Sequence, residues 1–481
     1  MRHIEVSARA GAPEETSADT RVIGLFEGEA PGDPALGRLV ELGEAKAGLK
    51  KVALAHEDAP GGGQRRVLIA GLGKRSEFDA ERARVAAAAA AGQAKELGAV
   101  SLSWAAPEGE GVSAALVEGT LLKLYGFDRF KSSPGDEDGG LEALELAGES
   151  VSDSELEFGR VAAEAANAAR DLQNLPANVA TPAFLAERAV EIAEEHEALE
   201  VELLDREAIV ARGMGAFAAV AQGTYAEPCL IVLRYRPADA AGPHMAYVGK
   251  AVTFDSGGIS IKPSAKMQEM KFDMSGGAAV LEATSAIARL GLPVTLTSIV
   301  PATENMPSGR SVKPSDIVTA LNGKTIEINN TDAEGRLILA DALAYAVEQG
   351  AERIVDLATL TGGVLIALGH THCGLWSNDD AWYEAVEAAG EASGEIGWRM
   401  PLHPEYLELT KGTYADLQNS SDQRLAVSNY AAEFLRQFVA ERPWVHVDIA
   451  GTAWGLTRNY VGKGASGFGT RMLIDLARRA A

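Results

Sequence analysis

Hydrophobic and polar residues follow two different periods along this chain, and these periods predict alternating strands and helices. Short apolar runs predict strands at residues 66–71, 100–104, 245–248, 294–300 and 353–358. Amphipathic or alanine-rich stretches predict helices at residues 82–97, 155–172, 278–290 and 337–349. Strands that alternate with helices are typical of βαβ units, so we expect an α/β fold with a mixed sheet flanked by helices.

Breaks in this pattern divide the chain unevenly. Residues 131–140 (KSSPGDEDGG) are rich in glycine, proline and acidic residues, which predicts a loop near the end of a first domain. The predicted helix that follows would connect this domain to the rest of the chain. We therefore expect an N-terminal α/β domain over residues 1–150, a linking helix over 151–172, and a larger C-terminal α/β domain over 173–481.

Composition limits the class of protein. Hydrophobic residues make up 47% of the 481 residues, enough for a sizeable buried core and more than is typical of disordered chains. The net charge of −24 disfavours binding to nucleic acid and to anionic membranes. No run approaches the roughly 18 apolar residues that span a bilayer, and no secretory signal is evident. Because the 2 cysteines cannot form a disulfide framework, we expect a cytoplasmic protein.

The most informative charged motif is the octapeptide Asn-Thr-Asp-Ala-Glu-Gly-Arg-Leu at residues 330–337. If its backbone is extended, the side chains of Asp332, Glu334 and Arg336 project to the same side. Two acids this close need compensating charge, because otherwise one of them would tend to hold a proton. A metal ion is the simplest compensation, so the motif predicts further ligands elsewhere in the chain.

A second charged segment, at residues 248–274, supplies candidate ligands. Its first strand ends near Lys250, and Asp255-Ser256-Gly257-Gly258 predicts a tight loop. Open α/β sheets bind ligands in loops at the carboxyl ends of their strands. The combined set is too acidic for an ordinary ion-pair network and suits divalent ions with oxygen ligands. It consists of the carboxylates of Asp255, Asp273, Asp332 and Glu334, with Lys250, Lys262 and Arg336 beside them.

In this order and spacing, the two charged segments resemble the signature segments of the leucyl aminopeptidase (cytosol aminopeptidase) family. Further segments that resemble this family lie at residues 169–178, 356–363 and 448–454, and more weakly at 67–74 and 127–131. The resemblance implies a macro-like N-terminal α/β domain and a C-terminal catalytic domain. It implies a metal-dependent aminopeptidase that releases N-terminal residues, preferably leucine and other apolar ones, from peptides by means of a water activated by two metals. Residues 418–429 depart from the glycine-rich character that the family shows there.

The resemblance also implies a role for each charged residue of the proposed metal site. Asp255 and Glu334 would bridge two divalent metal ions, Mn²⁺ or Zn²⁺. Asp273 and Lys250 would complete the ligands of one metal, and Asp332 would bind the other. An amine binds a metal only when it is deprotonated, so the ions must lower the pKa of Lys250.

Two cations are expected to act on the reacting groups. Lys262 would stay charged and stabilise the oxyanion that develops on the scissile carbonyl. Arg336 cannot act as a base, and the resemblance assigns to it a bicarbonate that shuttles the proton. The substrate-binding residues implied by family position are Met270, Met274, Asn330, Thr359, Leu360 (through its carbonyl group), Gly362 and Trp454. The resemblance further implies a homohexamer.

Other interpretations stay open at this point. A different two-metal hydrolase could use the same two cations to clamp the phosphate of an ester. A binding or regulatory protein could keep the fold, as the DNA-binding members of the family suggest. His370 and His372 could form a zinc pair on a strand, although the carboxylates already account for metals. His446 before Asp448 could form an acid–base dyad, but a core histidine is the simpler interpretation.

Overall fold

The computed structural model describes residues 4–132, 140–456 and 458–481. The chain forms two compact units. The first unit comprises Met1–Asn167 together with Thr457–Gly462, and the second comprises Ala168–Leu456 together with Lys463–Ala481.

The segment that connects the two units was expected to contain a loop and a helix. The loop expected at residues 131–140 falls mainly on residues 133–139, which lie outside the described residues. The expected connecting helix is present as α4 (Asp153–Asn174), which contributes residues to both units. The domain boundaries expected at residues 150 and 172 stay predictions.

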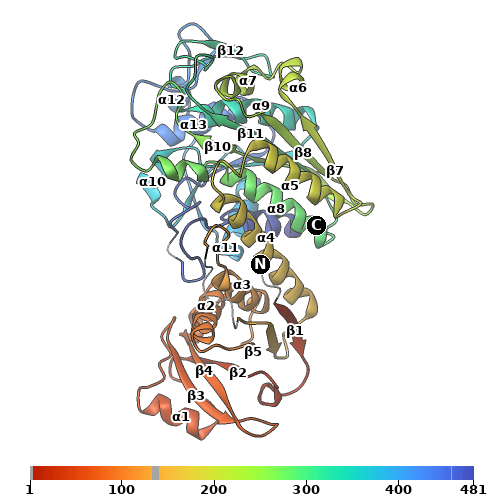
Figure 1. Ribbon diagram of the computed structural model, residues 1–481, viewed down its shortest axis with the longest axis vertical. Coiled ribbons are helices and arrows are strands. Elements are labelled where there is room, and N and C mark those ends of the chain that lie inside the picture. Colours follow the sequence, from red (N-terminus) through yellow and green to blue (C-terminus); the bar gives the residue numbers. More distant parts are fainter. Residues whose placement is uncertain (1–3, 133–139, 457) are drawn as a thin grey trace. The chain divides into compact units, whose positions relative to one another are not determined.

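The first unit is built on a six-stranded, mostly parallel sheet (Figure 1). The strand order is β1-β6-β5-β2-β4-β3, and β3 runs antiparallel to its neighbour β4. The strands are β1 (Glu5–Arg9), β2 (Thr20–Phe26), β3 (Val52–Asp58), β4 (Gln64–Gly73), β5 (Ser101–Ala105) and β6 (Ala143–Ala147). The helices are α1 (Pro34–Glu41), α2 (Ala80–Glu96) and α3 (Val112–Leu124), with 3-10 turns at Pro13–Glu15 and Arg75–Glu77. The strands and the helix expected between residues 66 and 104 are confirmed as β4, α2 and β5.

Small residues let α2 and α3 pack closely in this unit. Most of the buried residues of α2 are alanines. Gly119 of α3 lies against the backbone of Arg84 in α2, where any side chain would overlap the carbonyl group. The alanine-rich stretch that predicts a helix in the sequence is therefore also the surface on which the second helix packs.

The second unit contains a nine-stranded mixed sheet and a small three-stranded sheet. In the large sheet the order is β16-β15-β18-β14-β9-β11-β8-β7, and β10 pairs with β11. Its strands are β7 (Leu199–Leu204), β8 (Cys229–Tyr235), β9 (Ala241–Gly249), β10 (Ala251–Asp255), β11 (Val294–Asn305), β14 (Arg353–Ala358), β15 (Cys373–Ser377), β16 (Gly397–Arg399) and β18 (Trp444–Asp448). The small sheet comprises β12 (Ile317–Thr319), β13 (Thr325–Glu327) and β17 (Leu417–Gln418).

Helices cover both faces of the large sheet, as expected from the strand–helix alternation (Figure 1). On β9, Ala246 and Val248 pack in one core cluster with Leu337 of α9. Tyr247 points to the other face and donates from its hydroxyl to the carbonyl oxygen of Leu473 in α14. The helices are α5 (Pro182–Glu194), α6 (Arg206–Ala211), α7 (Gly215–Val220), α8 (Ser275–Arg289), α9 (Glu334–Glu348), α10 (Gly362–Leu368), α11 (Asp380–Ser393), α12 (Pro404–Glu408), α13 (Val427–Arg436) and α14 (Thr470–Ala480), with 3-10 helices at Ala221–Gly223 and Met267–Phe272.

Parallel strands of the large sheet end at a common edge. Strands β9, β10, β11, β14 and β18 are linked by parallel pairing, so their carboxyl ends face the same way. Polar residues stand at or just after these ends: Lys250, Asp255, Asn305, Thr359 and Asp448. This edge is where an open α/β sheet places its ligands.

Among the residues that the structure describes, no helix combines the length and the apolar character that crossing a bilayer requires.

Candidate metal centre

A glycine turn after β10 brings two segments of the candidate site together. Asp255 is the last residue of β10, and Gly257 and Gly258 follow with φ angles of 87° and 66°. Positive φ angles of this size favour glycine. A Cβ atom at Gly257 would lie 2.7 Å from Oδ1 of Asp332. The glycine therefore permits the close approach of this turn to the octapeptide.

The octapeptide at residues 330–337 is not extended, so the expectation that its three charged side chains project to one side is wrong. The side-chain oxygen of Asn330 accepts a hydrogen bond from the backbone N–H of Asp332 at 2.9 Å, and α9 begins at Glu334. Asparagine favours such a turn because its side chain bonds the backbone two residues on. Residues two apart in a helix lie about 200° apart around its axis. Glu334 and Arg336 consequently point in different directions.

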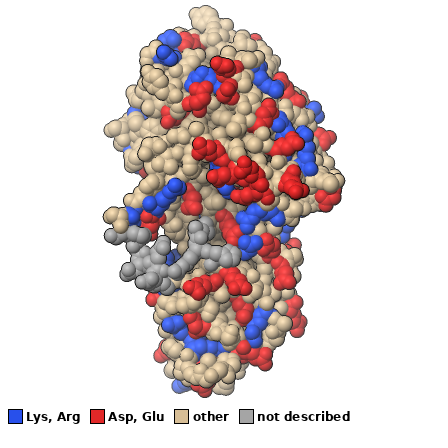
Figure 2. Space-filling model, turned by 45° about the vertical axis from the view of Figure 1, so that its right-hand side comes forward, with Lys and Arg blue, Asp and Glu red and all other residues tan. Residues whose placement is uncertain are grey.

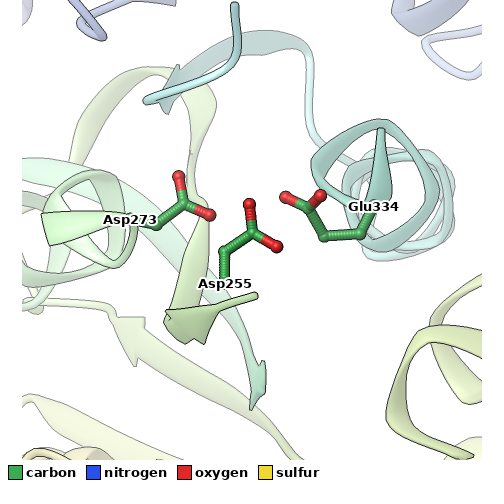
Figure 3. Close-up of side chains that lie close together, drawn as sticks. All are labelled: Asp255, Asp273 and Glu334. Carbon is green, nitrogen blue, oxygen red and sulfur yellow. The ribbon is translucent and has the colours of Figure 1, made fainter. Parts of the chain in front are cut away.

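Three carboxylates meet at the edge of the sheet (Figure 3). Asp255 comes from the end of β10, Asp273 follows a 3-10 helix, and Glu334 is the first residue of α9. One oxygen from each lies within 4.8 Å of the others, and all three residues are buried. In the part of the chain that the structure describes, this is the group of His, Cys, Asp or Glu residues arranged closely enough to hold a metal ion. Two separate sequence segments are thus joined in one site.

Lys250 lies inside this cluster. Its Nζ atom is 2.8 Å from Oδ1 of Asp273, 2.8 Å from Oε1 of Glu334, and donates to the carbonyl oxygen of Thr359 at 3.0 Å. Burial lowers the pKa of Lys250, but the two carboxylates outweigh burial, and the pKa lies above its ordinary value. Without a metal the lysine is therefore an ammonium, and a metal could bind its nitrogen only after displacing a proton.

Lys262 joins Asp332 to the cluster. Its Nζ atom lies 2.8 Å from Oδ2 of Asp255 and 2.7 Å from Oδ1 of Asp332. Burial lowers the pKa of Lys262, but attraction to the carboxylates, that of Asp255 foremost, outweighs it and raises the pKa above its ordinary value. All four candidate carboxylates therefore lie within one network that contains two ammonium groups.

The carboxylates of the network are incompletely neutralised. Burial raises the pKa of Asp255 and that of Asp273, and both lie above the ordinary value despite the lysines. Burial also raises the pKa of Asp332 to about 6. Glu334 differs: burial opposes its ionisation, but attraction to the lysines lowers its pKa below the ordinary value. The site thus needs more positive charge than its lysines supply, and a divalent cation would provide it.

One carboxylate oxygen of Asp273 is suited to serve as a metal ligand. Its Oδ1 atom accepts a hydrogen bond from the Thr359 hydroxyl at 2.7 Å. Its Oδ2 atom is buried and has no hydrogen-bond donor among the described residues. A buried carboxylate oxygen without a donor costs free energy unless a cation or a water satisfies it. The residues present therefore fit a hard or borderline divalent metal ion.

Arg336 lies on another side of α9. Its Nη1 atom donates to the carbonyl oxygen of Asn419 at 2.5 Å, and its guanidinium carbon lies 5.1 Å from the ring centre of Tyr430. Its Nε atom is buried and has no acceptor within the described part of the chain. The guanidinium thus keeps hydrogen-bonding capacity for an anion.

The residues expected to bind substrate differ in their burial and in their distance from the carboxylate cluster. Thr359 contacts both Asp273 and Lys250, Leu360 follows it in the loop before α10, and Gly362 is the first residue of α10. Trp454 stacks on Phe272, with ring centres 5.4 Å apart. Met270 and Asn330 are partly exposed, whereas Met274 is fully buried at the start of α8 and packs in the core. Their contact with a substrate stays a prediction.

Asn305 is a residue of the site that the sequence patterns did not identify. Its Nδ2 atom donates to Oδ1 of Asp255 at 2.8 Å and to the carbonyl oxygen of Thr331 at 3.0 Å, and lies 3.5 Å from Oε2 of Glu334. The strand expected at residues 294–300 continues to Asn305 as β11. If the strand had been predicted to extend to residue 305, the side-chain amide of Asn305 would have been expected at the ligand-binding edge of the sheet.

The histidines take structural positions. His370 and His372 precede β15 and do not lie on a strand, so the alternative of a zinc pair on a strand is wrong in its placement. Nδ1 of His370 bonds the carbonyl oxygen of Gly451 at 2.7 Å. His446 is fully buried, with Nδ1 2.6 Å from Oδ1 of Asp356. It is a core histidine and forms no dyad with the residue two positions on.

Comparison with known proteins places this arrangement in context. The model of the cytosol aminopeptidase family, catalytic domain, matches residues 167–474, and the N-terminal domain model of the same family matches residues 26–134. A probable cytosol aminopeptidase of Solibacter usitatus is 45% identical over 96% of this chain and 97% of its own. A probable cytosol aminopeptidase of Roseiflexus castenholzii is 42% identical over 99% of both chains.

A solved structure shows the same fold. The bottromycin maturation enzyme BotP in complex with Mn superposes on this chain with a TM-score of 0.87 at 34% identity. The match covers 96% of this chain and 99% of that enzyme. The likeness therefore extends over both units of the chain.

Proposed function

The chain belongs to the cytosol aminopeptidase family of metal-dependent peptidases, and on this premise we propose that it releases N-terminal amino acids, with leucine and other apolar residues preferred, from peptides. The buried cluster of Asp255, Asp273 and Glu334, with its unsatisfied oxygen and its shortage of positive charge, carries this proposal. Such a cluster suits a metallohydrolase.

We propose that two divalent ions, Mn²⁺ or Zn²⁺, bind in this site. Asp255 and Glu334 would bridge them, Asp273 and Lys250 would serve one, and Asp332 the other. The shared network of ion pairs among these residues supports the assignment. When bound, the ions would supply Lewis acidity toward the scissile carbonyl and lower the pKa of a water.

The remaining charged residues would act on substrate and proton. Lys262 stabilises the negative charge that develops on the scissile carbonyl oxygen, and its raised pKa keeps it cationic for this role. Arg336 would hold a bicarbonate, and this group would supply the proton-shuttle chemistry between the attacking water and the leaving amine. Its buried Nε, which lacks an acceptor among the described residues, supports anion binding there.

The apolar preference would come from residues around the loop before α10. Thr359, Leu360 and Gly362 would line one side of the pocket, which adjoins Asp273 through the Thr359 hydroxyl. The other proposed substrate-binding residues are Met270, Met274, Asn330 and Trp454. The adaptable methionine side chains would accept several apolar shapes.

We further propose that the protein is a cytoplasmic homohexamer that does not bind nucleic acid. The net charge of −24 disfavours a phosphate backbone as a partner. On the face that Figure 2 shows, basic side chains form small groups interspersed with acidic ones. Light scattering tests the oligomer, and a mobility-shift assay at low salt tests DNA binding.

The activity test uses the purified protein with Mn²⁺ and two chromogenic substrates that differ at the amino terminus. We expect release of p-nitroaniline from leucine p-nitroanilide and none from its N-acetyl derivative, because an aminopeptidase requires the free amine. A chelator should abolish the release, and Mn²⁺ should restore it. No release from either compound, together with turnover of p-nitrophenyl phosphate, would identify a phosphate-ester hydrolase instead.

A further inference from the structure

Asn419 is a fully buried residue that follows β17. Its side-chain oxygen accepts from the backbone N–H groups of Asn329, at 2.9 Å, and Asn330, at 3.3 Å. Its side-chain nitrogen donates to the carbonyl oxygens of Asn330, at 2.7 Å, and Ala333, at 3.3 Å. A primary amide has two donor hydrogens and two acceptor positions, so one short segment uses all of them.

The backbone of Asn419 makes two further bonds to the same region. Its N–H donates to the carbonyl oxygen of Glu327 at 3.0 Å, at the end of β13. Its carbonyl oxygen accepts from Nη1 of Arg336 at 2.5 Å. One residue therefore bonds the segment at points from the end of β13 to the first turn of α9, in addition to the bonds that Thr331 makes with Gly257 and Asn305. This segment carries Asp332, Glu334 and Arg336.

The segment needs such support because it has no regular structure of its own and carries crowded charges. The backbone of Ile328 still bonds Ser315 and Asp316, and from there to α9 the described chain forms turns outside the strand ladders. Asp332 of this segment and Asp255 at the end of β10 lie 2.7 and 2.8 Å from the same Lys262 ammonium, so two carboxylates are crowded together. Repulsion between two carboxylates opposes such close approach. Hydrogen bonds to backbone groups hold the segment against this repulsion without adding charge.

An amide suits this position better than a carboxylate. A carboxylate at residue 419 could still accept from the two N–H groups, but it would face the carbonyl oxygens of Asn330 and Ala333 with no hydrogen to donate. It would also add negative charge beside a site that already has an excess. The side chain of Asn419 bonds backbone atoms only, so its effect on the carboxylates passes through the chain that carries them.

We propose that Asn419 is a positioning residue of the metal site, which holds the segment from Asn329 to Arg336 in the geometry that binds the two ions. The inference rests on the proposed function, because it assumes that the site binds divalent metal. It assigns a role to a residue that lies outside both charged motifs in the sequence.

The test compares Asn419→Ala with a matched control, Asn378→Ala. The Asn378 amide also bonds two backbone groups, the carbonyl oxygen of Arg442 and the N–H of Trp444, both at 2.9 Å. Titration of metal-depleted protein with Mn²⁺ in a calorimeter gives the affinity. We expect Asn419→Ala to weaken Mn²⁺ binding by about 10- to 100-fold, as for other groups that orient metal ligands. Asn378→Ala should bind Mn²⁺ like the unsubstituted protein.

A purely structural role would have a different signature. It would lower the unfolding temperature of both variants and leave the Mn²⁺ affinity of Asn419→Ala unchanged, and this result would overturn the proposal. If Asn419→Ala does not fold, Asn419→Asp replaces it in the test, because aspartate keeps the shape and the acceptor atoms of the asparagine side chain. This variant should also weaken Mn²⁺ binding. If neither Asn419→Ala nor Asn419→Asp folds, Asn419 serves general stability and the proposal is rejected. If the unsubstituted protein does not bind Mn²⁺, the proposed function itself fails.

Discussion

The ammonium nitrogen of Lys250 lies 2.8 Å from a carboxylate oxygen of Glu334, so a cation of the chain itself stands among the proposed metal ligands. The lysine arrives at the end of β9 and the glutamate at the start of α9. Gly335 makes room for this contact, since a Cβ atom there would lie 2.8 Å from Nζ of Lys250. The need for space beside Lys250 thus explains the glycine at position 335 of the octapeptide.

Replacing Lys250 with methionine should destabilise the metal-free protein. The substitution leaves the buried carboxylates of Asp273 and Glu334 without their partner, a loss of about 3 kcal/mol in the free energy of unfolding at pH 8. The loss should shrink at pH 5, where those carboxylates can take up protons. Chemical denaturation of chelator-treated protein measures it. Lys313→Met, which removes a largely exposed lysine, is the control; equal stability of the two variants would contradict the prediction.

Metal binding should tighten as the pH rises. The pKa of Lys250 lies above its ordinary value, as do those of Asp255 and Asp273, so the metal-free site holds protons that a metal must displace. Affinity therefore increases with pH, and each binding event releases protons to the buffer. Mn²⁺ titration calorimetry at pH 6, 7 and 8 in buffers of different ionisation enthalpy measures both effects. A heat that is the same in every buffer would show that no proton is released.

Asp332→Ala should lower metal content and activity together. The carboxylate is proposed to bind one of the two ions, and its removal also leaves Lys262 with Asp255 alone. We expect the variant to retain about one metal per chain and to lose at least 10-fold in kcat. Metal analysis by mass spectrometry, beside the peptidase assay, tests this. Full activity with two bound metals would reject the ligand assignment.

Arg336→Lys should separate proton transfer from metal binding. Lysine keeps the positive charge but lacks the planar fork that grips a bicarbonate. Metal content should remain that of the unsubstituted protein, while kcat falls by about 10-fold or more, since general acid–base assistance is typically worth 10²–10⁴-fold. Added bicarbonate should stimulate the unsubstituted enzyme after bicarbonate depletion, and not the variant. Equal stimulation of both would remove bicarbonate from the proposed role.

Gly276→Ala should disrupt the packing of α8 under the sheet. A Cβ atom at Gly276 would overlap the carbonyl oxygen of Leu357 in β14, and neither backbone can give way easily. We expect a loss of about 2–3 kcal/mol or more in the free energy of unfolding. Gly309→Ala is the control, because its Cβ atom would meet nothing within 4 Å. Denaturant midpoints of the two variants measure the difference.

Much of the fold could be predicted from the sequence, because long periodic stretches determine it. The alanine-rich helix α2 and the buried strand β9 were both indicated by their apolar patterns. The start of α9 was placed three residues late, at 337 and not at Glu334. The alternation of acids in the octapeptide resembled a strand, whereas the turn at Asn330 and the helix behind it determine the geometry.

The site was predicted only in part. The charged candidates were found because they lie in two short motifs, and they form one network in the structure. Asn305 and Asn419 were missed because a lone asparagine carries no periodic or charge pattern. Their importance arises from contacts across the chain, 50 residues from Asp255 in one case and 90 from Asn329 in the other. Only tertiary structure brings such pairs together.

The order of the strands has a consequence for the synthesis of this protein on the ribosome. Every charged residue of the proposed metal site precedes residue 337, whereas β18 (Trp444–Asp448) lies between β14 and β15 in the sheet. A nascent chain that has not yet delivered β18 can pair β14 with β9 and β15 with β16, but it cannot join these two pairs into one sheet. Because this non-local pairing completes the sheet beside the strands that carry the site, we expect the site to reach its final geometry only after β18 has been made. We therefore expect peptide cleavage to begin only after this late strand has joined the sheet.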